Sequence, residues 1–348
     1  MTKFVTATGE ARIAGFGHAL PGVMDQQGLW DDYFARHYAG HPSAQRVWRS
    51  SGVQTRHGVL DPRVEDVSTW GTRARMERYI VEALPLGKDA VSVALDNAGV
   101  RADEVGLFAV ATCTGYATPG LDILLARDLG MDPGVQRLGI GHMGCYAAIP
   151  GLGAAADFVS THGQPAVLLC CELPSLHVQP ATDDVQQMVA HALFADAAAA
   201  VVLVPGGPGL SVRDVGAHTD ADTSRMMTWD VTDLGFRMGL SPEVPDVLAR
   251  HVRPVVTSLL AGHQLGVDDV TGWAVHPGGP RILDVVADQL ALPSDALSAS
   301  AEVLRDHGNC SSATVLLVLD EVLRRDAGGP VIAMAFGPGL TLYAALLG

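Results

Sequence analysis

Apolar runs of strand length alternate along this chain with amphipathic or alanine-rich stretches of helix length. The strand-like runs are Val105–Ala111, Ala166–Cys171, Ala197–Val204, Gly272–Val275 and Val331–Phe336. The helix-like stretches that accompany them are Gly87–Ala98, Asp122–Gly130, Ala147–Val159, Val244–Leu265 and Ala313–Arg325. Short, continuous apolar runs indicate buried strands, and their alternation with helices predicts an α/β fold with helices on both faces of its sheets.

A cluster of glycine and proline at Pro205–Gly209 lies between two strand-like patterns. Such residues break regular structure, so the cluster predicts a boundary there. We expect an N-terminal half of residues 1–205 and a C-terminal half of residues 206–348 with a similar alternation of elements. The length of 348 residues suits two domains or one large fold built from two halves.

The composition is that of a folded protein with a large core, because 48% of the residues are hydrophobic and only 18% are charged. The formal net charge of −15 argues against a generally basic protein that binds nucleic acid or a membrane surface. No apolar run approaches the ~18 residues of a membrane helix. Residues 1–10 contain Glu10 and no apolar stretch, so we expect no secretory signal.

The five cysteines are odd in number and form no CxxC pair, and they are Cys113, Cys145, Cys170, Cys171 and Cys310. This pattern argues against a disulfide framework and against a zinc site, and it favours a reducing, cytoplasmic setting. The sequence also lacks an HExxH motif and an acidic cluster, so we expect no metal.

Cys145 is the first candidate for chemistry, because a glycine-rich turn places it at the start of an alanine-rich helix. A helix N-terminus stabilises a thiolate, and Gly144 allows the sharp turn that would expose the side chain. The alternative is a small buried hydrophobic residue. The same turn contains Gly139-x-Gly141-x-x-Gly144, with Glu172 closing the next strand, a pattern that also fits a dinucleotide-binding oxidoreductase.

Three further segments carry candidate residues. His276 ends a short apolar strand, and Pro277 then directs the chain into a glycine turn, so the histidine could face a cleft. The alternative is a capping or core histidine. Asn309 lies in a turn of small residues before an amphipathic helix, where it could instead be the N-cap. Phe336-Gly-Pro-Gly-Leu-Thr could be an ordinary hairpin turn. Together, Cys145, His276 and Asn309 suit carbon–carbon bond formation on thioesters, with a thiolate carrying an acyl group and two donors stabilising an enolate.

From about residue 10 to its C-terminus, the sequence resembles the type III polyketide synthases, the chalcone synthase-like branch of the thiolase-fold condensing enzymes. The blocks that carry the resemblance are Cys113-Thr-Gly, Pro119-Gly-x-Asp122, Gly144-Cys-Tyr-Ala, Ala192-Leu-Phe-x-Asp196, His276-Pro-Gly-Gly-Pro-x-Ile-Leu-Asp, Gly308-Asn-x-Ser-Ser and Phe336-Gly-Pro-Gly-Leu-Thr. The resemblance implies a five-layered αβαβα fold made of two similar halves, a homodimer, and a catalytic triad of Cys145, His276 and Asn309. It implies no resident cofactor, with coenzyme A thioesters as substrates.

The family also implies roles for residues around the triad. Phe194 resembles its gatekeeper aromatic, and either Phe236 or Met238 holds the second gatekeeper position. The implied cavity residues are Cys113, Thr114, Thr118, Gly337, Pro338 and Gly339, with Thr118 where plant members have a methionine that reaches across the dimer. Cys113 matches a bacterial pattern. Gly278, Gly279 and Arg46 are the implied coenzyme A contacts. Arg46, Arg49 and Arg56 make the segment Gly40–Arg56 locally basic, so Arg49 and Arg56 could also contact the phosphates. The alternative for this segment is an ordinary solvated face.

The activity that follows from the resemblance has three stages. Cys145, as a thiolate paired with a His276 imidazolium, takes an acyl group from acyl-CoA. Malonyl-CoA or a substituted malonyl-CoA then loses carbon dioxide while His276 and Asn309 donate to its thioester carbonyl, and the enolate attacks the acyl group. Release follows by lactonisation, Claisen or aldol closure, giving a pyrone, a resorcinol or a related product. The alternative within the thiolase fold is a single-condensation enzyme like ketoacyl-acyl-carrier-protein synthase III.

Overall fold

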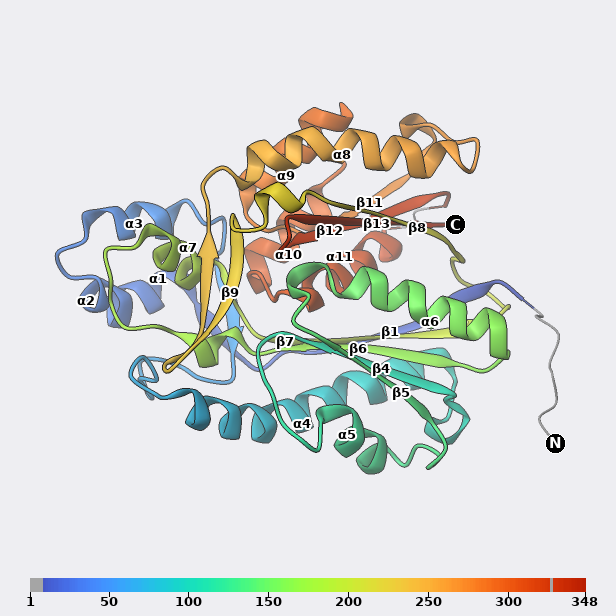
Figure 1. Ribbon diagram of the computed structural model, residues 1–348, viewed down its shortest axis with the longest axis horizontal. Helices are drawn as coiled ribbons and strands as arrows, with labels where there is room; N and C mark the ends of the chain where they lie inside the picture. The colour runs from blue at the N-terminus through green and yellow to red at the C-terminus, as the bar shows by residue number, and fades with distance from the viewer. Residues whose placement is uncertain (1–8, 326–327) are drawn as a thin grey trace.

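Five layers of alternating helices and sheets make up the computed structural model, which describes residues 9–325 and 328–348 (Figure 1). The first sheet has the strand order β1 (Ala11–Ala19), β7 (Ala197–Pro205), β6 (Ala166–Glu172), β4 (Leu107–Thr112) and β5 (Gln136–Gly141). The second has the order β11 (Gly272–Val275), β12 (Val331–Gly337), β13 (Thr341–Leu347) and β8 (Val212–Thr219). The cluster Pro205–Gly209 joins β7 of the first sheet to β8 of the second.

Helices cover both faces of each sheet, as the alternating pattern predicts. Helices α4 (Thr72–Ala98) and α5 (Leu121–Leu129) pack on the outer face of the first sheet, and α8 (Val244–Ala261) and α9 (Pro280–Leu290) form the outer layer of the second. Helices α6 (Ala148–His162) and α11 (Ser312–Arg324) lie between the sheets. This order of layers confirms the five-layered αβαβα fold.

The smaller elements gather at one end of the layers. They are β2 (Gly22–Asp25), α1 (Gln26–Leu29), α2 (Ala35–His37), α3 (Pro42–Arg49), β3 (Thr55–Gly58), α7 (Val185–Leu193), β9 (Met227–Thr232) and β10 (Gly235–Leu240). Helix α10 (Ser298–His307) instead packs beside α11. Strands β9 and β10 pair as a separate antiparallel ribbon, and α7 packs against both α3 and β10. Of these elements, α3, α7, β9 and β10 contribute lining residues to the main cavity described below.

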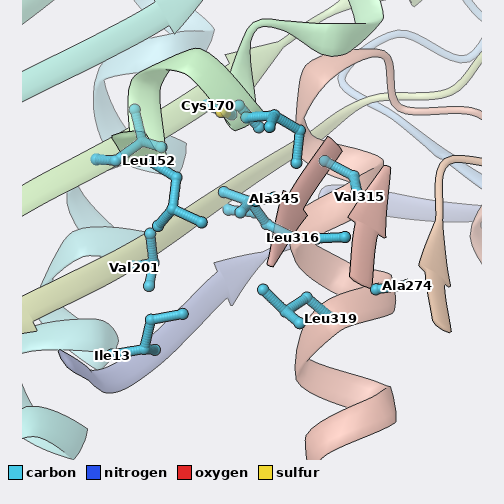
Figure 2. Close-up of a cluster of buried hydrophobic side chains, with 14 of the residues drawn as sticks. Ile13, Leu152, Cys170, Val201, Ala274, Val315, Leu316, Leu319 and Ala345 are labelled. Atoms are coloured by element: carbon cyan, nitrogen blue, oxygen red, sulfur yellow. The ribbon is translucent and has the colours of Figure 1, made fainter. Parts of the chain in front are cut away.

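The central core lies where α6 and α11 are held between the two sheets. Figure 2 shows Ile13 of β1 and Val201 of β7 facing the same apolar cluster as Leu152, Leu316 and Leu319 of the two helices. Every residue from Ser312 to Leu319 is buried, because a helix in a middle layer has sheet on both sides. The small residues that surround these leucines allow the layers to approach closely.

Two sequence predictions need comment. The helix predicted at Gly87–Ala98 is the second half of α4, which begins at Thr72 and contains Pro85 in its interior. Proline usually ends or kinks a helix, yet this helix continues through Pro85. The block from Phe336 to Thr341 is a hairpin turn, since β12 and β13 pair antiparallel up to Gly337 and Thr341.

Within residues 9–325 and 328–348, no helix combines the length and the apolar character that a membrane span requires. The expectation of no secretory signal concerns residues 1–10, of which residues 1–8 lie outside the described residues.

Candidate active site

Cys145 lies in a short 3-10 turn, Gly144–Tyr146, between β5 and α6. The turn requires glycine at its first position, because Gly144 has φ +76° and a Cβ there would come within 2.7 Å of Cδ of Pro338. Cys145 is 7% exposed and lines a cavity at the N-terminal end of α6. The sequence therefore predicted the local setting of this cysteine correctly.

His276 follows β11, and its backbone N–H donates to the carbonyl of Met334 at 2.8 Å. Its side chain is 1% exposed, and neither ring nitrogen has a hydrogen-bond partner among the described residues. Buried polar atoms without partners are rare in folded proteins. The ring lines the same cavity as Cys145, so both nitrogens are free to bind a ligand there.

Asn309 follows the left-handed residue Gly308, which has φ +74°. Its backbone is fixed on both sides, since its N–H donates to the carbonyl of Leu193 and its carbonyl accepts from the N–H of Ala195, each at 2.9 Å. Its side-chain Oδ1 accepts from the N–H of Ser311 at 2.9 Å, and its Nδ2 has no acceptor within the described part of the chain. The N-cap of α11 is Ser311, so the interpretation of Asn309 as N-cap is wrong.

One cavity of about 560 Å³ brings these three side chains together, although they come from three separate segments. Cys145, His276, Asn309 and Phe336 all line it. Most of its remaining wall is apolar and includes Val189, Leu193, Met227, Leu240, Val244, Pro245, Leu248 and Ile282. The other side is formed by Ser50 and Ser51 after α3, and by Gly278, Gly279 and Arg281 at the start of α9.

A second, smaller cavity of about 60 Å³ adjoins the first, and Phe194 and Met238 line both. Of the two candidates for the second gatekeeper, Met238 is therefore the one at the constriction. Phe236 lines only the smaller cavity, where its ring stacks on His177 with centroids 4.7 Å apart.

Trp229 closes the smaller cavity further and was not singled out from the sequence. Its indole N–H donates to the carbonyl of Cys113 at 2.7 Å, and its ring meets His177 edge to face. The sequence of β9, in which Trp229 stands between polar residues, is the one local feature that could have indicated a place in the cavity wall. His177 was missed too, because nothing in its neighbourhood distinguishes it from the other histidines of the chain.

Several residues that the resemblance placed in the cavity lie elsewhere in this chain. Cys113 and Thr114 line neither of these two cavities, because both turn toward the buried carboxylate of Glu172. Thr118 is exposed and lines neither cavity. The segment Gly337–Gly339 packs behind the Cys145 turn: a Cβ on Gly337 would lie 3.4 Å from the backbone nitrogen of Cys145.

The dinucleotide-binding interpretation is contradicted. Gly139 and Gly141 lie within β5 rather than in a loop between a strand and a helix, so they form no cradle for a pyrophosphate. Glu172 is fully buried and accepts hydrogen bonds from the backbone of Cys113 at 3.0 Å, from Thr114 Oγ1 at 2.7 Å and from Ser312 Oγ at 2.6 Å. Burial raises the pKa of this carboxyl, which has no access to a ribose.

Burial also sets the charge states of the two central residues. It raises the pKa of the Cys145 thiol to about 12, although a hydrogen bond with Ser311 acts in the opposite direction. It lowers the pKa of His276 to about 3. Burial therefore opposes the charged form of each group, and the thiolate–imidazolium pair stays a prediction. A neutral imidazole can accept the thiol proton during the reaction, and it can donate an N–H to an oxyanion.

The three arginines of the locally basic segment have different surroundings. Arg46 and Arg49 are exposed on the last turn of α3, and within the described residues neither side chain forms an ion pair or a hydrogen bond. Arg56 is 5% exposed, and its guanidinium is bonded to protein oxygens throughout. The expectation that Arg56 contacts coenzyme A is therefore wrong, because every donor of its side chain is occupied.

No cluster of three or more histidine, cysteine, aspartate or glutamate side chains suited to a metal ion occurs in residues 9–325 and 328–348.

Both halves of the chain match models of the chalcone and stilbene synthases. The model of their N-terminal domain matches residues 1–208, and the model of their C-terminal domain matches residues 219–348. The chain is 37% identical over 314 residues to a 1,3,6,8-tetrahydroxynaphthalene synthase of Streptomyces peucetius subsp. caesius, which covers 87% of this chain and 82% of that protein. It is 32% identical over 316 residues to the alpha-pyrone synthesis polyketide synthase-like Pks18 of Mycobacterium tuberculosis, covering 85% and 80% of the two chains.

Solved structures agree with these sequence matches. The crystal structure of PKS-I from the brown alga Ectocarpus siliculosus superimposes with a TM-score of 0.92 at 28% identity, covering 98% of this chain and 99% of that one. The C-terminal type III polyketide synthase domain of Steely1 from Dictyostelium gives a TM-score of 0.91 at 25% identity, with 97% and 99% covered.

Proposed function

Because the chain belongs to the chalcone and stilbene synthase family, we propose that its activity as a type III polyketide synthase depends on Cys145, His276 and Asn309. The observation that carries this proposal is their convergence in one cavity, where the imidazole nitrogens of His276 and Nδ2 of Asn309 have no partner within the described chain. Enzymes of this family use acyl-CoA and malonyl-CoA as substrates.

The first step is acyl transfer. The thiol of Cys145 gives its proton to neutral His276 as sulfur attacks the thioester carbonyl of an acyl-CoA. The carbon–sulfur bond to coenzyme A breaks, and the coenzyme A thiolate takes the proton from His276. The acyl group is then held as a thioester on Cys145.

The second step makes the enolate and the new carbon–carbon bond. The malonyl carboxylate leaves as carbon dioxide, and its bonding electrons form an enolate whose oxygen receives hydrogen bonds from His276 and from Nδ2 of Asn309. The enolate carbon attacks the acyl carbonyl, and sulfur leaves as the Cys145 thiolate, ready to be reloaded.

We propose that the product is a pyrone or a hydroxylated aromatic, since relatives of this chain are named for tetrahydroxynaphthalene and alpha-pyrone synthesis. The test is incubation with malonyl-CoA and a panel of acyl-CoA starters, with products identified by mass spectrometry. We expect products extended by more than one malonyl-derived unit. A product with a single added unit, formed only from a carrier-protein thioester, would instead support an enzyme like ketoacyl-acyl-carrier-protein synthase III.

Coenzyme A binding should depend on a local basic cluster, because the whole chain carries a net charge of −15. Arg46 and Arg49 end α3, directly beside Ser50 at the cavity, and Arg281, Gly278 and Gly279 line it from the start of α9. We propose that the two arginines contact the phosphates of coenzyme A, since guanidinium groups bind phosphate oxygens in pairs.

Replacing Arg46 with alanine should raise the apparent KM for malonyl-CoA about two- to fivefold with little change in kcat, as expected for one exposed charge contact. The effect should shrink at high salt, because ions screen the attraction. Malonyl-N-acetylcysteamine lacks the phosphates and should show no difference between the variant and the wild type. Arg127→Ala, which removes an exposed arginine from α5, is the control. Equal losses with both substrates would contradict the phosphate contact.

We also propose a homodimer formed through the edge of the first sheet. Among the described strands, β5 pairs with β4 alone, and five of its six residues are exposed. Tyr116, Ile123 and Leu138, which precede or lie on this strand, are exposed large hydrophobic residues. An open, partly apolar edge strand favours pairing with another chain, and a twofold axis would add a second copy of the same strand. Thr118, which bonds to Tyr116, would then lie near the partner.

Light scattering should give about twice the chain mass of 36.4 kDa at micromolar concentration. Leu138→Asp should shift the population toward monomer, because a charge at the edge opposes strand pairing. Val64→Asp changes a more exposed valine elsewhere and should leave the mass unchanged. A monomeric wild type would contradict the dimer.

Two further assignments remain proposals. We propose that residues 1–205 and 206–348 are the two halves of the fold, supported by the confinement of each sheet's strands to one of these ranges. We propose a cytoplasmic location, supported by five cysteines that are all unpaired and buried.

A further inference from the structure

Arg56 on β3 is a buried cation without an acidic partner. Its side chain forms no ion pair in the described part of the chain, and the nearby carboxylate of Asp196 is instead bonded by Val59 and Ser175. Burial lowers the pKa of the Arg56 guanidinium to about 9, so it remains charged near pH 7. A buried charge is costly unless hydrogen bonds replace its hydration, so the groups that bond it indicate its role.

All five N–H groups of the guanidinium are occupied. Nη1 donates to the carbonyls of His191 and Phe194 at 2.7 and 2.8 Å, and Nη2 donates to the carbonyl of Ala192. Nε, at 2.8 Å, and Nη2 share the Oε1 atom of Gln26. The fork lies over the ring of Trp48, with Cζ 5.0 Å from the ring centroid.

Three of these acceptors are at the end of α7. The last carbonyls of a helix have no partner within it, and they carry the negative end of the helix dipole. Arg56 supplies both the donors and the positive charge that this end requires. Lysine could not replace it fully, because an ammonium has three donors and no planar fork.

The segment that Arg56 holds supplies two parts of the active site. Phe194 is the C-cap of α7, and its ring lies at the constriction between the two cavities. On either side of it, the carbonyl of Leu193 and the N–H of Ala195 bind the backbone of Asn309. By contrast, the turn that carries Cys145 packs against β12, β13, α6 and α11.

We propose that Arg56 is a positioning residue that fixes the segment 191–195 and thereby sets the places of Phe194 and of the oxyanion donor Asn309. The inference rests on the proposed function, because it gives Asn309 a role in decarboxylation. Arg56 therefore supports one part of the site and not the other. Its loss displaces Asn309 but leaves the turn that carries Cys145 in place.

The test uses Arg56→Lys in the full-length protein. We expect kcat for malonyl-CoA decarboxylation to fall about 10- to 100-fold, the scale of an ångström-sized misplacement of a catalytic group. The rate at which iodoacetamide alkylates Cys145 should stay within about twofold of wild type, because that turn is held separately. A merely structural role would reduce both rates together, in step with the melting temperature.

Arg75→Lys is the matched control. Arg75 is fully buried, and its partners in the described chain are backbone carbonyls outside the segment 191–195, those of Trp70, Val67, Ser68, Leu176 and Val178. It should lower the melting temperature while keeping the decarboxylation kcat. If Arg56→Lys does not fold, Gln26→Leu removes the acceptor of two Arg56 N–H groups and should give the same selective loss to a smaller degree.

Decarboxylation at the wild-type rate in folded Arg56→Lys would overturn the proposal, provided that Asn309→Ala abolishes it. If Asn309→Ala also retained decarboxylation, the proposed role of Asn309 as an oxyanion donor would be wrong. The proposed effect of Arg56 through Asn309 would then be wrong as well.

Discussion

Cys145→Ala should abolish polyketide formation while decarboxylation of malonyl-CoA continues. Condensation requires the sulfur to carry the acyl group, and loss of a catalytic nucleophile costs several orders of magnitude, about 10⁶-fold in a well-studied protease. Decarboxylation needs only the donors to the thioester oxygen, and His276 and Asn309 remain in the same cavity. The measurement is product mass spectrometry together with the release of acetyl-CoA from malonyl-CoA.

Cys170→Ala is the control for this variant. Cys170 is fully buried in β6 and belongs to the core between the sheets rather than to either cavity (Figure 2). Its replacement should retain the product pattern. Wild-type polyketide output from Cys145→Ala would exclude this cysteine as the acyl carrier.

Asn309→Ala should lose decarboxylation as well as condensation. The substitution keeps the backbone bonds to Leu193 and Ala195 and removes only the side chain, whose Nδ2 has no acceptor in the described chain. Removing one oxyanion donor costs about 2.7–4 kcal/mol, or about 10²–10³ in kcat. Initial rates of carbon dioxide release measure the effect directly.

Asn97→Ala provides a comparison, because Asn97 on α4 bonds the carbonyl of Phe16 far from the cavity residues. It should decarboxylate malonyl-CoA at the wild-type rate. If Asn309→Ala decarboxylated malonyl-CoA within about threefold of the wild-type rate, the side chain of Asn309 would not be an oxyanion donor, because the loss of such a donor costs far more.

The sequence by itself determined the layered α/β fold and the local setting of Cys145. Runs such as Ala166–Cys171 are apolar at every position, and only a strand covered on both faces buries such a run completely. The glycine before Cys145 and the alanine-rich helix after it are likewise local features, because one residue's φ and the next residues' propensities decide them. Patterns of this kind can be read without knowing any partner in space.

The tertiary structure decided which residues meet. From the sequence, Phe236 and Met238 are equally good candidates for the second gatekeeper, and in the folded chain only Met238 lines both cavities. The motif around Cys113 resembles one that lines the cavity in the family. In the folded chain, however, the backbone N–H of Cys113 donates to the buried carboxylate of Glu172.

Arg56 shows the same limit most clearly. In the sequence it is one of three basic residues in an exposed-looking segment, with nothing to separate it from Arg46 and Arg49. Its burial follows from the end of a helix more than a hundred residues away, where carbonyls without partners require a cation. Local sequence encodes turns and apolar faces, whereas the satisfaction of buried polar groups depends on neighbours that only the folded chain supplies.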